Sequence, residues 1–411
     1  MNIQSTVAAR IGSLAGEYRD HFALVGGTVR DLLLDRPLRD LDLVSWLSEA
    51  QLSALGFRPV IPVSSSPIWF LHTPETGTVE VTRLSSPDDL PENLASRDFT
   101  VNAMAMGLDG RLVDPLAGAG DLDARVLRPC GCSCFEDDPL RIFRAFRFEA
   151  DGWHMSSDTQ DLIRANVWED QLGRLPVERF SGELLKALAA PRPERFFELM
   201  ISFQVGSSFL PELFRMPAVP AGPLQYHPEG DLFTHALQVL ERVSLQSNQP
   251  LARLCAMFHD LGKLATEPVL YPKHHGHESS GAEMADGFCR RLRLPTGYSR
   301  ALAAVCRLHG TLNRWSELRD ATKVKMACQA LQAGVESILP VVSEADKAGG
   351  SNPEEWQRAL DAARATTEEL GVSPDRLSEV PERSRGDFLF ERRVALFAGR
   401  TLRDGSAGIS I

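Results

Sequence analysis

The sequence predicts an α+β protein whose N-terminal head mixes strands and helices and whose remainder is all-α. Apolar runs and alternating apolar–polar segments, which are typical of strands, fall within about the first 115 residues. Helical periodicity dominates afterwards, over 139–149, 158–168, 177–189 and 193–203. A segment with four prolines, 216–230, indicates a linker into a second helical region. Because 411 residues exceed one ordinary core, we expect a head (1–118), a helical neck and body (119–222), a second helical domain (223–350) and a helical tail (351–411).

Composition and charge narrow the class of protein. Hydrophobic residues make up 43% of the chain and charged residues 24%, which is typical of a folded globular protein. No apolar run approaches the roughly eighteen residues of a membrane helix, so we expect no membrane partner. An odd number of cysteines, seven, favours a reducing compartment and hence a cytoplasmic location. The net charge of −11 argues against an extended surface that binds nucleic acid without regard to sequence, but it is compatible with a local basic channel.

A glycine turn lies between the first predicted strand and helix. The apolar run 21–25 stops at Gly26 and Gly27, and helical spacing follows over 28–34. Two glycines allow close backbone approach, and a helix N-terminus attracts anions, so the turn is a candidate phosphate cradle. A turn with no ligand is the alternative.

Two aspartates on the next predicted strand, 39–44, strengthen the first interpretation. Asp40 and Asp42 are two residues apart, so both side chains point to one face while the leucines between and after them point to the core. Such a pair is costly unless cations lie between the carboxylates, and Mg²⁺ with substrate phosphates meets that need. Glu80, on the alternating segment 78–84, is a candidate third carboxylate, although a glutamate facing solvent fits equally well.

Five segments together resemble the tRNA nucleotidyltransferase (CCA-adding) family of the bacterial and eukaryotic class, within the polymerase-β-type superfamily. They are GGTVRD (26–31), RDLD (39–42), SRDFTVNAMAM (96–106), VDPLAGAGDLDARVLR (113–128) and DDPLRIFRAFRF (137–148). Two positions depart from the family pattern, since Ser96 replaces an arginine and Asp137 replaces a glutamate.

The resemblance implies a polymerase-β-like nucleotidyltransferase head that uses Mg²⁺ to transfer nucleotides from CTP to a tRNA 3′ end. Asp40, Asp42 and Glu80 are then the catalytic carboxylates, and the first two hold the metal. Arg97 and Asp98 are expected to meet the ribose. The full set of nucleotide-binding residues that the resemblance implies is Gly26, Gly27, Arg30, Arg97, Asp98, Asn102, Asp138, Arg141, Arg144 and Arg147.

Asp138 and Arg141 carry the predicted choice of base. At positions i and i+3 they share one face if both lie on a helix. The carboxylate accepts from an exocyclic amino group and the guanidinium donates to a ring nitrogen, a pattern that fits cytosine and adenine but not uracil or guanine. Arg144 and Arg147 continue roughly the same face towards triphosphate or tRNA. An ordinary intrahelical ion pair is the alternative.

The segment between Glu80 and Arg97 is short, with only sixteen residues, 81–96. CCA-adding members carry a longer flexible loop here, whereas members that add only the two cytidines have a shortened one. The resemblance therefore predicts a CC-adding enzyme that needs a separate A-adding enzyme. The alternatives are a complete CCA-adding enzyme that uses CTP and ATP, and a poly(A) polymerase.

A second metal site is predicted in 223–350, where seven of the ten histidines gather. An apolar helix over 251–263 ends near His259 and Asp260, with Gly262 as the predicted stop. The pattern resembles the HD phosphohydrolase domain, which implies a bound Mg²⁺, Mn²⁺ or Ni²⁺ and hydrolysis of phosphomonoesters or cyclic phosphates. Gly310 replaces a common acid of that family. The implied ligands are His235, His259, Asp260 and Asp346, with His275, His277 and His309 as surrounding contacts. The alternatives are a degenerate domain that only packs, or an HD phosphohydrolase with a degenerate transferase head.

Overall fold

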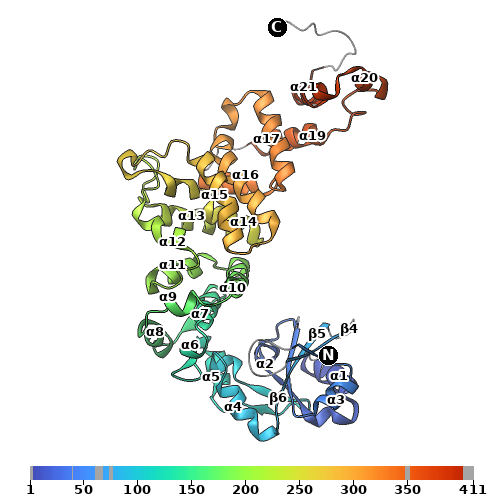
Figure 1. Cartoon of the computed structure of the whole chain (residues 1–411), viewed down its shortest axis with the longest axis vertical. Coiled ribbons are helices and arrows are strands. Elements are labelled where there is room, and N and C mark those ends of the chain that lie inside the picture. Colours follow the sequence, from blue (N-terminus) through green and yellow to red (C-terminus); the bar gives the residue numbers. More distant parts are fainter. Residues whose placement is uncertain (1–2, 39, 61–67, 74–76, 348–351, 401–411) are drawn as a thin grey trace. The chain divides into compact units, whose positions relative to one another are not determined.

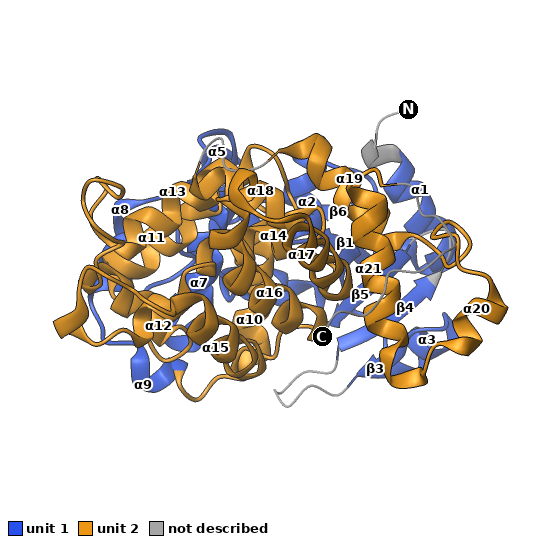
Figure 2. Cartoon of the chain, turned by 90° about the horizontal axis from the view of Figure 1, so that it is seen from above, with its two compact units in different colours: residues 1–172 blue, residues 173–411 orange. Residues whose placement is uncertain are grey.

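The computed structural model describes residues 3–400, apart from 39, 61–67, 74–76 and 348–351. The chain forms two compact units, 1–172 and 173–411 (Figure 2). The first contains the predicted head and the beginning of the predicted neck, and the second contains the rest. Among the described residues, no helix is both long and apolar enough to cross a bilayer.

A seven-stranded mixed sheet, with helices around it, forms the head of the first unit (Figure 1). Its strand order is β3-β4-β5-β2-β1-β6-β7. The pairing of β2 with β5 is parallel, and the other pairings are antiparallel. The strands are β1 Phe22–Val25, β2 Asp40–Ser45, β3 Arg58–Val60, β4 Ile68–Thr73, β5 Gly77–Arg83, β6 Ala105–Gly107 and β7 Leu112–Val113, and a separate parallel pair is β8 Val126–Leu127 with β9 His154–Met155.

Short helices connect these strands and complete the first unit. The α-helices are α1 Ile3–Ala15, α2 Gly27–Leu33, α3 Glu49–Ala54, α4 Leu90–Ala95, α5 Gly118–Asp123, α6 Cys134–Asp137, α7 Leu140–Ala150, α8 Ser157–Arg164 and α9 Glu169–Leu172, and the 3-10 turns are η1 Gly16–His21, η2 Pro87–Asp89 and η3 Thr100–Asn102. The predicted head elements agree with β1, α2, β2 and β5 to within a residue or two. The predicted start of the second strand, Arg39, lies outside the described residues.

Burial explains why the central strands carry the site. All four residues of β1 are buried, as expected for an apolar strand between two neighbours. In β2 the alternation holds: Leu41 and Leu43 are buried in the core, while Asp40 and Asp42 point the other way. The first unit therefore presents its acidic residues on a firmly packed strand.

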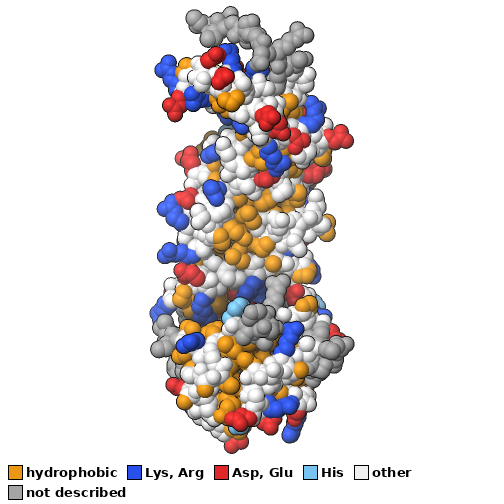
Figure 3. Space-filling view, turned by 90° about the vertical axis from the view of Figure 1, so that its right-hand side faces the viewer, with side chains coloured by type: hydrophobic (Ala, Val, Ile, Leu, Met, Phe, Trp, Pro, Cys, Tyr) orange, Lys and Arg blue, Asp and Glu red, His pale blue; other side chains and the backbone are white. Residues whose placement is uncertain are grey.

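The second unit is helical throughout its described residues. Its α-helices are α10 Val177–Ala189, α11 Glu194–Phe203, α12 Pro211–Arg215, α13 Leu232–Ser244, α14 Pro250–Phe258, α15 His277–Arg291, α16 Thr296–Leu312, α17 Asp320–Ala333, α18 Ile338–Asp346, α19 Pro353–Arg364, α20 Pro374–Glu379 and α21 Arg385–Phe397, and its 3-10 turns are η4 Met216–Ala218, η5 Leu261–Ala265, η6 Pro268–Leu270, η7 Trp315–Glu317 and η8 Glu382–Ser384. On the face shown in Figure 3, hydrophobic side chains gather over the middle of this unit, with charged side chains around them.

A buried arginine joins the helices before the 216–230 segment to those after it. Arg253 on α14 donates to the carbonyls of Leu188 (2.7 Å) and Ala190 (2.6 Å) at the end of α10. Its Nε also donates to Ser247 O (2.8 Å), so the guanidinium satisfies carbonyls from both parts of the unit. This contact places the N-terminal half of α14 against the C-terminal end of α10.

Candidate functional site

Three predicted carboxylates come together at the junction of β2 and β5. Asp42 and Glu80 are paired positions of these two parallel strands, so their side chains project from the same face of the sheet. Asp40 lies two residues before Asp42 and therefore on that face too. Asp40 is exposed, whereas Asp42 and Glu80 are half-buried. The parallel register, which the sequence did not reveal, is what brings Glu80 to the aspartates.

Electrostatics at this junction favour a bound cation. Burial raises the pKa of Asp42, and Asp40 adds to the rise, although Arg97 and Arg30 oppose it. Burial likewise raises the pKa of Glu80, and Asp42 adds to it. The carboxylates thus repel one another in a partly desolvated place, and a divalent cation between them would relieve both costs. The residues fit a Mg²⁺ site that is completed by substrate oxygens.

The predicted glycine turn lies directly beside Asp42. Gly26 has φ 64° and ψ −133°, a conformation that residues with a side chain rarely adopt. A side chain at Gly26 would collide with the guanidinium of Arg97, and Oδ2 of Asp42 lies 3.7 Å from the place of its Cβ. Thr28 Oγ1 accepts a hydrogen bond from Asp42 N (2.8 Å), which ties the turn to the strand. The turn, one arginine and the carboxylates therefore converge on one point.

Arg97 is a half-buried cation with unused hydrogen-bonding capacity. Burial lowers its pKa, while Asp42 and Asp98 raise it. Its Nε is buried and has no hydrogen-bond partner among the described residues, and its Nη2 makes a long contact with Asn93 Oδ1 (3.4 Å). A buried donor without a partner is costly, so an anionic ligand beside Gly26 would be stabilised here.

A chain of hydrogen bonds fixes the other predicted nucleotide-binding residues. Arg30 Nη1 donates to Asn102 Oδ1 (2.7 Å), Asn102 Nδ2 donates to Asp98 Oδ1 (3.0 Å), and Arg144 Nε donates to Asp98 Oδ2 (2.7 Å). Phe99 N also donates to Asp98 Oδ1 (2.9 Å). Burial alone would raise the pKa of Asp98, but Arg144 and the hydrogen bonds lower it to about 2. Asp98 is thus a buried, ionised anchor, and its predicted contact with ribose stays a prediction.

The expected arrangement of Asp138 and Arg141 on one helix was wrong. Asp138 has extended backbone (φ −152°, ψ 96°) between α6 and α7, because the residue before a proline avoids the helical conformation. Its carboxylate accepts from Leu140 N (3.2 Å) and so covers the start of α7. Arg141 lies in the first turn of α7, so the two side chains come from a loop and a helix.

The arginines of α7 are held by protein groups in this structure. Arg141 donates to the carbonyls of Ser96 (2.7 Å), Cys134 (3.2 Å) and Arg97 (3.3 Å). Arg144 holds Asp98, and the guanidinium of Arg147 lies 4.1 Å from the ring centre of Phe148. The predicted contacts of these arginines with base, triphosphate or tRNA stay predictions.

The four predicted ligands of the HD region meet in the second unit. His235 Nε2 lies 3.3 Å from His259 Nε2, 3.2 Å from Asp346 Oδ1 and 3.6 Å from Asp260 Oδ2. His259 Nε2 is 3.3 Å from Asp260 Oδ2 and 3.8 Å from Asp346 Oδ1. The histidines and Asp260 are buried, and they come from α13, the end of α14 and the turn after it, while Asp346 ends α18. Residues over one hundred positions apart therefore surround one point.

The ring orientations fit a metal at that point. His259 Nδ1 lies 2.8 Å from the Ala256 carbonyl and His235 Nδ1 lies 2.7 Å from a Glu229 carboxylate oxygen, and both oxygens can only accept. Each Nδ1 is therefore the donor, and in the neutral form of each ring Nε2 has a lone pair directed at the other ring. Two lone pairs 3.3 Å apart repel unless a cation lies between them. Neutral imidazoles whose outer nitrogen is fixed in this way are typical metal ligands.

The sequence did not single out the groups that support these ligands. Asn313 Nδ2 donates to Asp346 Oδ2 (2.7 Å), Lys263 Nζ lies 2.5 Å from Asp260 Oδ2, and Glu229 holds His235. Burial raises the pKa of Asp260, but Lys263 and His259 outweigh it and hold that pKa well below its usual range. The spacing of Lys263, three residues after Asp260, was the one local signal for its role.

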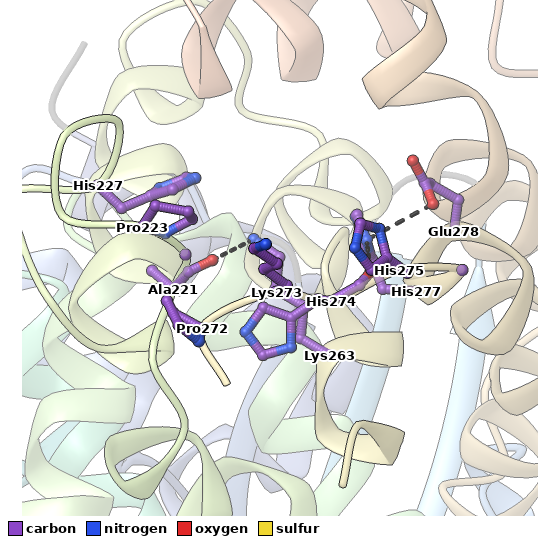
Figure 4. Close-up of a pocket in the computed structure, with 12 residues that line it drawn as sticks. Ala221, Pro223, His227, Lys263, Pro272, Lys273, His274, His275, His277 and Glu278 are labelled. Carbon is purple, nitrogen blue, oxygen red and sulfur yellow. Dashed lines mark hydrogen bonds and ion pairs between the residues drawn. The ribbon is translucent and has the colours of Figure 1, made fainter. Parts of the chain in front are cut away.

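Two of the three surrounding histidines reach the ligand set. His277 Nε2 is 3.3 Å and His309 Nε2 is 3.5 Å from Asp260 Oδ1, whereas His275 is exposed. A cavity of about 340 Å³ is lined by Lys263 and His277, which both contact Asp260, and Figure 4 shows the residues around it. Its lining includes His227, Lys263, Lys273, His274, His275, His277 and Glu278. The predicted helix 251–263 ends earlier, at Phe258, and Gly262 lies in η5.

Three family models match successive parts of the chain. The Poly A polymerase head domain matches residues 71–128, the probable RNA and SrmB-binding site of polymerase A matches 152–216, and the HD domain matches 232–338. The first of these ranges contains Glu80 of the head site, and the last contains His235, His259 and Asp260 of the second site.

Curated relatives are similar over most of the chain. A multifunctional CCA protein of Methylococcus capsulatus is 36% identical over 389 residues, which cover 86% of this chain and 89% of that protein. A multifunctional CCA protein of Legionella pneumophila is 37% identical over 327 residues, 74% of this chain and 78% of that protein. One of Azoarcus sp. is 34% identical over 375 residues, with coverages of 83% and 89%.

Solved structures share the fold. The Thermotoga maritima CCA-adding enzyme complexed with tRNA has a TM-score of 0.64 and 21% identity, covering 98% of this chain and 92% of that one. The Bacillus stearothermophilus CCA-adding enzyme in complex with CTP has a TM-score of 0.64 and 23% identity, with coverages of 97% and 94%. These similarities confirm the expected fold class, a polymerase-β-like head followed by helical domains.

Proposed function

Because this chain belongs to the family of multifunctional CCA proteins, which are nucleotidyltransferases, we propose that it adds the complete CCA end to tRNA from CTP and ATP. The relatives that carry this name match 74% to 86% of the chain, across both units. The observation that supports the transfer chemistry most directly is the register that pairs Asp42 with Glu80 beside the Gly26 turn.

In this proposal the residues around the carboxylates bind and orient the nucleotide. Asp40, Asp42 and Glu80 would hold Mg²⁺, which supplies charge stabilisation at both ends of an in-line displacement. The amides of the Gly26 turn and Arg97, which the sequence assigned to the ribose, would bind triphosphate oxygens, because both offer positive charge at one point. The chain from Arg30 to Arg144 through Asn102 and Asp98 would keep this pocket rigid.

Base selection is proposed for Asp138 and Arg141, now as a loop residue and a helix residue. A carboxylate that accepts from N4 of cytosine or N6 of adenine, next to a guanidinium that donates to N3 or N1, selects these two bases. Arg141 donates to the Ser96 and Arg97 carbonyls, so its position is linked to Arg97, which is proposed to bind the triphosphate.

One observation favours the CC-adding alternative. The short segment after Glu80 is folded: β5 ends at Arg83, η2 and α4 follow, and Leu90 and Leu94 of α4 are buried in the head core. A packed helix in this place is unlike the long flexible loop expected of CCA-adding members. The proposal of complete CCA addition follows the named relatives, and CC addition is the second candidate.

Nucleotide incorporation decides between these candidates. A tRNA transcript that lacks its last three nucleotides is incubated with Mg²⁺ and labelled CTP, with CTP plus ATP, or with ATP alone, and the products are separated at single-nucleotide resolution. Addition of C, C and then A supports the proposal. Two cytidines without adenosine supports the CC-adding candidate, a long A tail from ATP alone supports a poly(A) polymerase, and no incorporation contradicts both proposed transfer activities.

We further propose that the second unit is a metal-dependent phosphohydrolase with His235, His259, Asp260 and Asp346 as ligands. What supports this is the convergence of two imidazole lone pairs and two carboxylates at one buried point beside an open cavity. Hydrolysis of a 2′,3′-cyclic nucleotide and of a phosphomonoester should require added Ni²⁺, Mn²⁺ or Mg²⁺. The variant His259→Ala should lose this activity and keep nucleotide incorporation. Unchanged hydrolysis in that variant would contradict the proposal.

A further inference from the structure

We propose that His227 selects the substrate of the second unit: its Nε2 accepts a hydrogen bond from a hydroxyl group on the carbon next to the one that bears the phosphate. The substrate class is then a ribonucleoside 2′- or 3′-phosphate, in which a free ribose hydroxyl neighbours the phosphate ester. This inference rests on the proposed phosphohydrolase activity and adds a specificity-determining residue that lies outside its four metal ligands.

Glu229 orients the ring of His227 in the same way as it orients the ligand His235. One carboxylate oxygen of Glu229, Oε1, lies 2.9 Å from His227 Nδ1 and 2.7 Å from His235 Nδ1. That oxygen only accepts, so Nδ1 of His227 carries the proton, and in the neutral ring Nε2 keeps a lone pair. Within the part of the chain that the structure describes, this Nε2 has no hydrogen-bond partner. The two rings meet edge to face with centroids 4.9 Å apart, so the free lone pair belongs to a close neighbour of a metal ligand.

The loop that carries His227 is anchored next to the metal centre. Lys263 Nζ, which contacts Asp260, also donates to the Ala221 carbonyl (2.7 Å). A side chain at Gly222 would collide with Cδ2 of His227 and would lie 3.0 Å from its Nε2. Glycine at this position therefore leaves the His227 ring in place and its Nε2 uncovered. The acceptor thus has a fixed position before a substrate binds.

The cavity that His227 lines offers different partners to a phosphate and to a hydroxyl group. Its volume of about 340 Å³ lies within the range of small-molecule sites, about 300–1,000 Å³, so it has room for more than a phosphate group. Phosphate oxygens accept hydrogen bonds, so they fit the metal centre and the ammonium group of Lys273, which Figure 4 shows between His227 and His277. They do not fit the lone pair of His227 Nε2, whereas a hydroxyl can donate to it. A substrate with a phosphate and a hydroxyl side by side therefore matches the lining.

A ribose supplies this pair of groups. Its 2′ and 3′ carbons are neighbours, so a phosphate ester on one leaves a hydroxyl on the other, and a 2′-deoxyribose 3′-phosphate lacks that hydroxyl. With the deoxy compound bound, the His227 acceptor would lose water without gaining a partner. A site built to bond a hydroxyl discriminates against the analogue that lacks it. We expect the preference for the ribose compound to be about tenfold.

Two substrates that differ in one hydroxyl test the proposal on the full chain. Release of phosphate from adenosine 3′-phosphate and from 2′-deoxyadenosine 3′-phosphate is measured with Ni²⁺ at about pH 8, where an imidazole with the ordinary pKa of about 6.5 is neutral. The native chain should show a kcat/KM about tenfold higher for the ribose compound. In His227→Asn, which can still donate to Glu229 but ends before the position of Nε2, the ratio should fall to about one. Tyr226→Phe, a change at an exposed neighbour in the same loop, is the matched control and should keep the native ratio.

The outcomes separate this inference from the activity on which it rests. Equal kcat/KM values for the two substrates in the native chain would overturn the selection of a hydroxyl. A fall of the same size for both substrates in His227→Asn would overturn the role of His227, because it would mean that His227 only supports His235 through Glu229. No Ni²⁺-dependent phosphate release from either substrate would overturn the phosphohydrolase activity, and this inference with it. Circular dichroism melting of each variant checks folding, and His227→Phe replaces His227→Asn if the latter unfolds.

Discussion

The two candidate metal sites differ in their ligand types and in how deeply the ligands are buried. In the first unit, carboxylates stand on the open face of a sheet, with Asp40 exposed and Asp42 and Glu80 half-buried. In the second unit, His235, His259 and Asp260 are each at most 3% exposed. The carboxylates of the first site repel one another. The imidazoles of His235 and His259 in the second site are each oriented by a hydrogen bond at Nδ1.

This difference indicates how each site acquires its metal. Mg²⁺ usually keeps several waters and is bound by a few carboxylates together with substrate phosphates, so the head site is complete only when a nucleotide is present. A set of oriented imidazoles and carboxylates binds a transition ion without substrate. We therefore expect metal binding at the head to depend on nucleotide and metal binding at the HD centre to be independent of it.

The largest expected effect comes from Asp42→Asn. Removing one of the paired carboxylates should lower the rate of nucleotide incorporation about 10³-fold, because several kcal/mol of charge stabilisation in the transition state are lost. Hydrolysis of a cyclic phosphate by the same preparation is the internal control and should be unchanged. Loss of both incorporation and hydrolysis in Asp42→Asn would show that the two sites are not independent.

A smaller effect is expected when a supporting group of the HD centre is removed. Glu229→Ala deletes the acceptor that holds Nδ1 of His235, and loss of such a partner lowers metal affinity or activity by about 10- to 100-fold. Titration of the variant with Ni²⁺, followed by hydrolysis, measures the change. Glu241→Ala is the matched control, because Glu241 is an exposed glutamate on α13, the helix of His235, and this variant should match the native affinity. Equal affinities for all three proteins would show that the site does not depend on preorientation.

The third prediction concerns the buried anchor behind the head site. The pKa of Asp98 in the folded chain, about 2, is below its ordinary value, so its ionised form stabilises the fold above about pH 4. This contribution, about 2.5 kcal/mol, should be lost as the pH falls from 4 through 2. The difference in unfolding free energy between the native chain and Asp98→Asn should therefore narrow below pH 4 in urea titrations.

A control sharpens that measurement. Asp109→Asn removes an exposed carboxylate in the same unit and should differ little from the native chain at any pH. A constant difference in unfolding free energy between the native chain and Asp98→Asn from pH 7 to pH 2.5 would contradict this prediction. It would mean that the ionised Asp98 carboxylate does not stabilise the fold behind the head site.

Much of the head was predictable because its signals are local. The strand before Gly26, the Asp-x-Asp alternation and the helical spacing of α2 all depend on residues close in sequence. Asp138 shows the limit: its spacing to Arg141 suggested a shared helix, but Pro139 keeps it extended. Glu80 was an ambiguous glutamate until the parallel pairing of β5 with β2 placed it opposite Asp42.

By itself, the sequence determined the family, the α+β class and the residue types at both sites, since backbone propensities, alternation and short motifs are properties of neighbouring residues. Only the tertiary structure decided which of these residues meet. Asn313 and Glu229 became supports of the HD centre, and His277 rather than His275 reached Asp260, because helices distant in sequence pack closely where Gly262 lacks a side chain. Such contacts depend on the free energy of packing the whole unit, which no local pattern contains.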